Sequence, residues 1–137
     1  MPVRMPEKHR IRGWQRVLVF IANVNHFGKL TCHACHKHIE NEYPTVDHVE
    51  CRSNGCDPKD INNTIVLCNS CNGRKCNRSV EETFGTEKAN EIAQYMATRL
   101  FSPDDLVKAR EINKAFTKTA DVLAAIALDA KSSAVVI

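Results

Sequence analysis

Two pairs of cysteines frame the part of this chain whose residues could do chemistry. Cys32 and Cys35 form one CxxC pair, and Cys68 and Cys71 form a second pair after 32 intervening residues. A zinc ion takes four thiolates at tetrahedral corners, and a tight turn supplies two of them, so two such turns complete one site. The spacing therefore predicts a structural Zn²⁺ ion that closes the loop between the two pairs.

Polar residues of a second kind lie inside this loop and directly after it. Asp47 offers a hard oxygen ligand, and Asn72 an amide oxygen, for Mg²⁺ or another divalent cation. His48 follows Asp47 on the opposite face of an expected strand, and a neutral imidazole there can take a proton from water. Asn63 begins the strand expected to pair with it, where its amide can orient the imidazole. Together these groups predict metal-assisted hydrolysis of a phosphodiester bond.

Basic residues accompany these groups, and they make DNA the expected partner. Arg74, Lys75 and Arg78 follow the second cysteine pair, and Lys75 lies one helical turn from Asn72, where its ammonium could meet a phosphate. Residues 1–16 carry five bases against a single acid. Such an arm either lies along phosphates or is a solvated chain end.

The spacing of these residues resembles that of the HNH endonuclease family, which has a ββα-metal fold. Fourteen residues separate His48 from Asn63 and eight separate Asn63 from Asn72, and the flanking CxxC pairs are also typical. The resemblance covers roughly residues 30–83. It implies that Asp47 and Asn72 bind the catalytic cation, that His48 is the general base and that Asn63 positions it. Asn72 stands where the family name has its final histidine, and the family's frequent double glycine is absent.

A non-catalytic zinc-knuckle protein that binds nucleic acid is the alternative function. The zinc site and the basic residues serve both functions, whereas Asp47, His48 and Asn72 are needed only by the nuclease. A redox role for the CxxC pairs is disfavoured, because four paired thiolates favour a metal. The neighbouring residues are not expected to take part in this chemistry. We interpret three of them as surface histidines, His33, His36 and His38, and Glu50 as a solvated charge of the hairpin. The remaining cysteines, Cys51, Cys56 and Cys76, are interpreted as free thiols.

Hydrophobic periodicity and turn residues predict the elements that position these groups. We expect a helix from Trp14 to Gly28, although the run 17–21 would also suit a strand. The further expected elements are a strand at 44–51, a turn at 53–55, a strand at 63–68, and helices at 69–85, 86–101 and 103 to about 130. They predict an α+β fold with a small zinc-stapled ββα-metal core, an N-terminal helix and two C-terminal helices. The corresponding units are residues 1–29, 30–85 and 86–137.

An apolar stripe on the last expected helix leaves two alternatives open. Its members recur at alternating spacings of three and four residues: Ala109, Ile112, Phe116, Thr119, Leu123, Ile126 and Ala130. The stripe is either the seam of a homodimer or a cover for the chain's own hairpin and the 86–101 helix. The residues of this tail carry no visible chemistry.

Composition limits the class of protein. The chain has 137 residues, of which 43% are hydrophobic and 26% charged, as in a single globular domain. It contains no apolar run near the roughly 20 residues that span a membrane, and its first residues lack the apolar core of a signal peptide. Four of its seven cysteines fall in CxxC pairs, which favours metal binding in a reducing compartment over disulfides. We therefore expect a protein without membrane contact in the cytoplasm of a bacterial or phage-infected cell.

Overall fold

The computed structural model describes residue 11 and residues 13–39, 43–49, 61–76 and 78–135. Its elements are α1 (Gly13–Phe27), β1 (Thr45–His48), the 3-10 helix η3 (Ile61–Asn63), β2 (Thr64–Leu67), α2 (Asn69–Lys75), α3 (Val80–Phe84), α4 (Thr86–Thr98), α5 (Pro103–Ala115) and α6 (Thr119–Val135). Six α-helices and a two-stranded antiparallel sheet in these ranges confirm the predicted α+β class. Across the same ranges, no helix has the length and apolarity to cross a membrane. Some of the residues interpreted from the sequence lie outside these ranges: Arg10, Arg12, Glu50, Cys51, Cys56 and the turn at 53–55.

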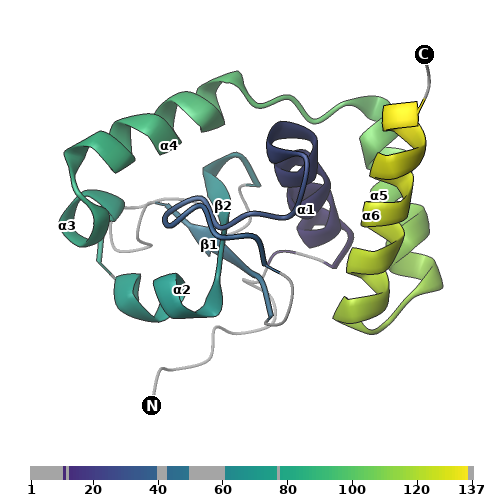
Figure 1. Cartoon of the computed structure of the whole chain (residues 1–137), viewed down its shortest axis with the longest axis horizontal. Helices are drawn as coiled ribbons and strands as arrows, with labels where there is room; N and C mark the ends of the chain where they lie inside the picture. The colour runs from purple at the N-terminus through teal and green to yellow at the C-terminus, as the bar shows by residue number, and fades with distance from the viewer. Residues whose placement is uncertain (1–10, 12, 40–42, 50–60, 77, 136–137) are drawn as a thin grey trace.

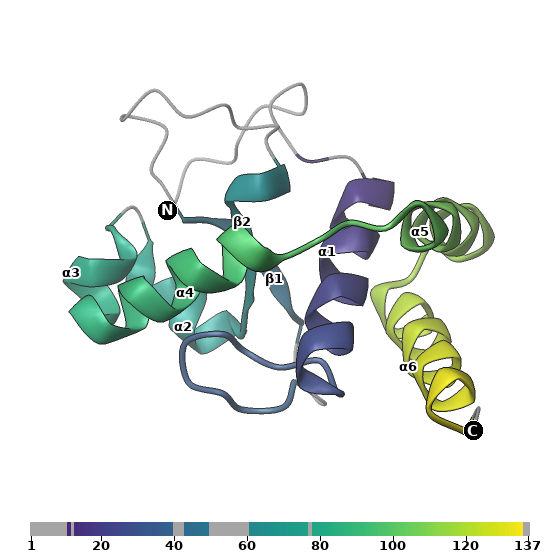
Figure 2. The ribbon, with the colours of Figure 1, turned by 90° about the horizontal axis from the view of Figure 1, so that it is seen from above.

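Helix α1 lies between the sheet on one side and α5 and α6 on the other (Figures 1 and 2). Every residue from Val17 to Val24 is buried, as expected for a helix covered on several sides. That burial explains why the run 17–21 also resembles a strand in the sequence. The helix ends close to the predicted stop: Gly28 has φ +86°, which glycine adopts readily, and its N–H donates to the carbonyl of Val24 (2.7 Å).

Strands β1 and β2 pair so that Asp47 lies opposite Ile65 and His48 lies opposite Thr64. All four residues of β2 are buried, because α1, α2 and α4 all pack against this strand. Both strands are shorter than predicted. Helix α2 begins one residue after β2, with Cys68 as its N-cap, so the order β1, β2, α2 is the predicted strand, strand, helix.

The prediction of one helix over 69–85 is wrong in one respect, because this segment forms two helices, α2 and α3. The chain leaves α2 at Cys76, where φ is +47°. Ser79 then caps α3, since its hydroxyl oxygen accepts from the N–H of Glu82 (3.1 Å) and its O–H reaches the Glu82 carboxylate (3.2 Å). Ser79-x-x-Glu82 has the sequence pattern of a capping box, and it marks a new helix start within the single helix predicted over 69–85.

The helix predicted from 103 to about 130 is also two helices, so the C-terminal part holds α4, α5 and α6 rather than two helices. Ser102 caps α5 as predicted, with Pro103 in the first turn. The break follows Phe116, whose extended backbone (φ −129°, ψ 136°) ends α5. Both α5 and α6 then pack against α1 on the flank that faces away from the sheet (Figure 2).

Most of the apolar stripe of these helices belongs to the core of the chain itself, although Phe116 is exposed. Ala109 and Ile126 are buried, and Ile112, Leu123 and Ala130 pack against the same cluster. The main partner of the stripe is α1, which neither alternative had named. A homodimer that used this seam would have to separate α5 and α6 from α1.

Candidate functional site

The four cysteines of the two CxxC pairs meet at one point. Their sulfur atoms all lie within 4.8 Å of one another, and the Sγ atoms of Cys35 and Cys68 are 3.9 Å apart. Zinc–sulfur bonds of about 2.3 Å at tetrahedral corners place sulfur atoms roughly 3.8 Å from one another. The cluster Cys32, Cys35, Cys68 and Cys71 can therefore hold a metal ion such as zinc, as the sequence predicted.

Burial changes the acidity of the thiols in this cluster. Burial, and then the thiol of Cys68, raises the pKa of Cys71 above its ordinary value. Burial likewise raises the pKa of Cys32. Buried thiols stay protonated unless positive charge is nearby, whereas metal binding deprotonates them. Burial acts in the same direction on Cys35, but the pKa of this thiol is lowered, because hydrogen bonds from the backbone of Lys37 and from the other three thiols outweigh its burial. A metal ion bound to the cluster would displace the remaining thiol protons.

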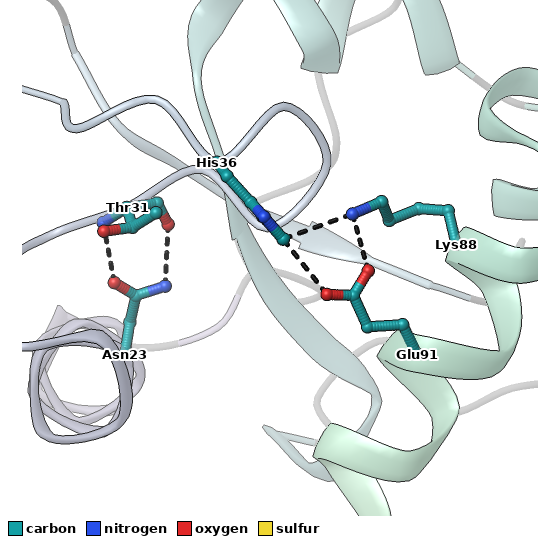
Figure 3. A network of polar contacts seen from close by, with 5 residues as sticks. All are labelled: Asn23, Thr31, His36, Lys88 and Glu91. Carbon is teal, nitrogen blue, oxygen red and sulfur yellow. Dashed lines mark hydrogen bonds and ion pairs between the residues drawn. The ribbon is translucent and has the colours of Figure 1, made fainter.

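The turn that carries Cys32 and Cys35 is fastened to three elements. On α1, the side chain of Asn23 accepts from the N–H of Thr31 (2.9 Å) and donates to its carbonyl (2.8 Å) (Figure 3). On β2, the carbonyl of Val66 accepts from the N–H of His33 (3.0 Å). On α4, Glu91 pairs with the ring of His36 (3.1 Å), and Lys88 joins both side chains (Figure 3). These contacts position the first cysteine pair opposite the second.

The interpretation of His33 as a surface residue is wrong. Its side chain is 1% exposed, and its ring centroid lies 4.4 Å from that of Tyr95 and 5.2 Å from that of Phe27. Burial lowers the pKa of His33 to about 4, so it is neutral at pH 7 and packs as an aromatic group. His36 and His38 are exposed, as expected.

A second site lies along β1. Asp47 and His48 at the end of β1 share a pocket of about 400 Å³ with Asn72 of α2 and Arg16 of α1. Asn72 follows Cys71 directly, so the same short helix that binds the predicted zinc also places this amide. The structure therefore brings together both predicted ligands of the catalytic cation and the predicted base.

Lys75 is buried rather than displayed to a phosphate, which corrects the expectation for this residue. It is 2% exposed, and its Nζ lies 2.9 Å from Oδ2 of Asp47 and donates to the carbonyl of His48 (3.1 Å). Burial raises the pKa of Asp47, although the Lys75 ammonium beside it acts in the opposite direction. Lys75 thus fixes the carboxylate and the end of β1 from the protein interior.

We expect Lys75→Met to lower the free energy of unfolding by about 3 kcal/mol, because it leaves Asp47 without its ion-pair partner. The double variant Lys75→Met/Asp47→Asn should lose less than the two single variants added together. Urea denaturation of the four proteins measures this coupling. Lys108→Met is the matched control, since its pair with Asp129 is largely exposed (3.0 Å) and should contribute less than about 1 kcal/mol. Equal losses at Lys75 and Lys108 would contradict the buried pair.

Asn63 lies beside this pocket rather than in its lining. It is the last residue of η3, and its carbonyl accepts from the N–H of Val49 (2.9 Å), the residue after His48. Its backbone is therefore fastened to the end of β1, close to the predicted base.

Comparison with known proteins returned no matching family model, no matching curated protein and no matching solved structure.

The arginines around the site divide into two groups. Arg74 and Arg78 are exposed, as a contact to a phosphate requires, and the Arg74 guanidinium lies over the ring of Phe84 (5.5 Å to the centroid). Arg16 lines the pocket itself, donates to the carbonyl of Pro44 (3.2 Å) and lies over the ring of Phe20 (5.4 Å). The sequence assigned Arg16 only to the basic arm, although its spacing of four from Phe20 places both residues on one helix face.

Proposed function

We propose that this chain is a metal-dependent DNA endonuclease of the HNH type, in which β1, β2 and α2 form a ββα-metal core. The observation that carries the proposal is the pocket shared by Asp47, His48 and Asn72. A zinc-knuckle binding protein would need the cysteines and the exposed arginines. It would not need a carboxylate, an imidazole and an amide around one pocket.

Asp47 and Asn72 suit a hard divalent cation such as Mg²⁺. Both offer oxygen atoms, which this ion prefers, and both reach the same pocket from different elements. Burial raises the pKa of Asp47 even with Lys75 beside it, so further positive charge on the pocket side would favour the ionised carboxylate. A cation held by these two residues would supply positive charge to the leaving oxygen of a phosphodiester.

The protein's own groups perform the remaining tasks in this proposal. His48 takes the proton from the attacking water at a ring nitrogen. Asn63, fastened beside the end of β1, orients the imidazole. Lys75 holds the Asp47 carboxylate through their ion pair on the side of the protein interior. Arg16, which already lines the pocket, is placed to contact the phosphate that is cut.

Incubation with supercoiled plasmid distinguishes the nuclease from a binding protein. Protein dialysed free of loosely bound metal but retaining zinc should convert the plasmid to the open circle after Mg²⁺ is added, since one site cuts one strand per binding event. Without Mg²⁺ the protein should bind the plasmid and leave it uncut. A chelator is used to remove the loosely bound metal. Circular dichroism of the same mixtures then verifies that the protein is still folded and that the chelator has not removed the structural zinc. Binding without cutting over a range of divalent cations would favour the zinc-knuckle alternative.

We expect DNA affinity to depend steeply on salt, because exposed arginines would bind phosphates. Each phosphate contact contributes about 0.9 to the slope of log K against log salt concentration. Arg74→Gln/Arg78→Gln should therefore reduce the slope by about 1.8, for any DNA sequence, while Lys114→Gln, at an exposed position of α5, should leave it unchanged. Fluorescence anisotropy with a labelled duplex measures the slopes, and a wild-type slope near zero would point to a different partner.

A further inference from the structure

Arg99 links the end of α4 to the segment that carries Asn63. It is the C-cap of α4, and its guanidinium donates to three backbone carbonyls of another part of the chain. Nη1 reaches the carbonyl of Thr64 (2.7 Å), and Nη2 reaches those of Ile61 (3.1 Å) and Asn62 (3.2 Å). The accepting carbonyls lie in η3 and in the first residue of β2, on both sides of Asn63 along the chain.

Two aromatic rings fix the orientation of this guanidinium. Its central carbon lies 5.3 Å from the ring centroid of Tyr95 and 4.8 Å from that of Phe101. A planar guanidinium held against aromatic rings loses little further freedom when it forms hydrogen bonds. Arg99 is therefore a preorganised clamp and not a freely moving surface charge.

The clamped segment is the one that fastens Asn63 to the end of β1. The carbonyl of Asn63 accepts from the N–H of Val49 (2.9 Å), and Thr64 pairs with His48 in the sheet. A shift of η3 would therefore move Asn63 relative to the imidazole of His48. Small displacements of positioning groups cost large factors in rate, because the reacting geometry is lost.

We propose that Arg99 is a positioning residue of the nuclease, which holds Asn63 beside His48 by fixing the backbone of η3. The inference rests on the proposed function, because it assigns the clamp a task in the cleavage step. A clamp that only stabilised the fold would reduce the amount of folded protein and leave the turnover of the folded fraction unchanged.

Two variants of Arg99 test the positioning role. Arg99→Gln removes the guanidinium, and Arg99→Lys keeps the charge without the planar fork. Arg110→Gln is the matched control, since the Arg110 guanidinium also lies over an aromatic ring, that of Trp14 (4.7 Å), but on α5. Zinc content and circular dichroism give the folded fraction of each protein.

Cleavage kinetics and amide hydrogen exchange are measured on all four proteins. We expect kcat per folded molecule to fall by about 10²-fold in Arg99→Gln and by less in Arg99→Lys, with KM for DNA little changed. We also expect the Val49 N–H to exchange about tenfold faster or more in Arg99→Gln, because the loss of hydrogen bonds from a charged donor loosens its acceptor segment. Arg110→Gln should match the wild type in both measurements.

Each result supports or overturns the inference. Wild-type kcat in folded Arg99→Gln would overturn it even if Val49 exchanged faster, because the clamp would then be structural only. Unchanged exchange of Val49 would overturn it as well. If the wild-type protein does not cleave DNA, the proposed function fails, and Val49 exchange still decides whether Arg99 fixes η3 beside β1. Should Arg99→Gln not fold, Arg99→Lys supplies the same comparison.

Discussion

Replacement of His48 by alanine should lower the rate of DNA cleavage by about 10²–10⁴-fold, because the attacking water then has no positioned base. His48 shares its pocket with the two proposed cation ligands, Asp47 and Asn72. The loss should appear in kcat, since the arginines that would hold the DNA backbone remain. Single-turnover cleavage of a labelled plasmid, with protein in excess over DNA, measures the chemical step directly.

His38→Ala is the matched control for this variant. His38 is exposed and lies in the bridge to Thr31, away from the pocket of Asp47. It should cleave at the wild-type rate. Zinc content and anisotropy with duplex DNA should be the same for both variants and the wild type. Wild-type cleavage by well-folded His48→Ala would rule out His48 as the base.

Replacement of Cys68 by serine should abolish folding. Cys68 caps α2 and lies 3.9 Å from Cys35, so its loss opens the proposed zinc site and the link between the first turn and the helix. The binding free energy of structural zinc is also folding free energy, on the order of 10 kcal/mol. A domain of this size has a total stability of only about 5–15 kcal/mol. We expect insoluble protein, or a chain whose circular dichroism lacks the helical signal.

Cys76→Ser provides the comparison, because Cys76 is exposed and lies outside the four-sulfur cluster. It should fold, bind one zinc ion per chain in elemental analysis and melt near the wild-type temperature. Removal of the metal from the wild type by a strong chelator should reproduce the effect of Cys68→Ser. Soluble, folded wild-type protein without bound metal would contradict a structural zinc site.

The sequence predicted those features that depend on short-range patterns. The two CxxC pairs predicted the sulfur cluster, because each pair is a local turn and a tetrahedral ion requires both. The caps at Ser102 and the stop at Gly28 were likewise visible as single residues with a known conformational preference. The signal for the break between α2 and α3 is also local, since Ser79 and Glu82 have the sequence pattern of a capping box, but the prediction of one continuous helix over 69–85 did not use it.

Other features arise only from the folded chain. The end of α5 at Phe116 lets both C-terminal helices cover α1, and no strong breaker such as glycine or proline marks that position. Lys75 has the sequence pattern of an exposed basic residue, and it is buried because its ammonium is close enough to pair with Asp47. The contacts of Arg99 join residues 35 or more positions apart, so no local pattern could indicate them.

The Mg²⁺ requirement of plasmid cleavage tests the central claim most directly. Rates are measured over a range of Mg²⁺ concentrations for zinc-loaded wild type, Asn72→Ala and Asn69→Ala, which alters an exposed residue of the same helix. The proposal predicts cleavage by the wild type and by Asn69→Ala at the same half-maximal Mg²⁺ concentration. Asn72→Ala should need at least about tenfold more, because the cation loses a proposed protein ligand. A wild type that never cleaves, or an Asn72→Ala variant with an unchanged Mg²⁺ requirement, would contradict a catalytic cation site between β1 and α2.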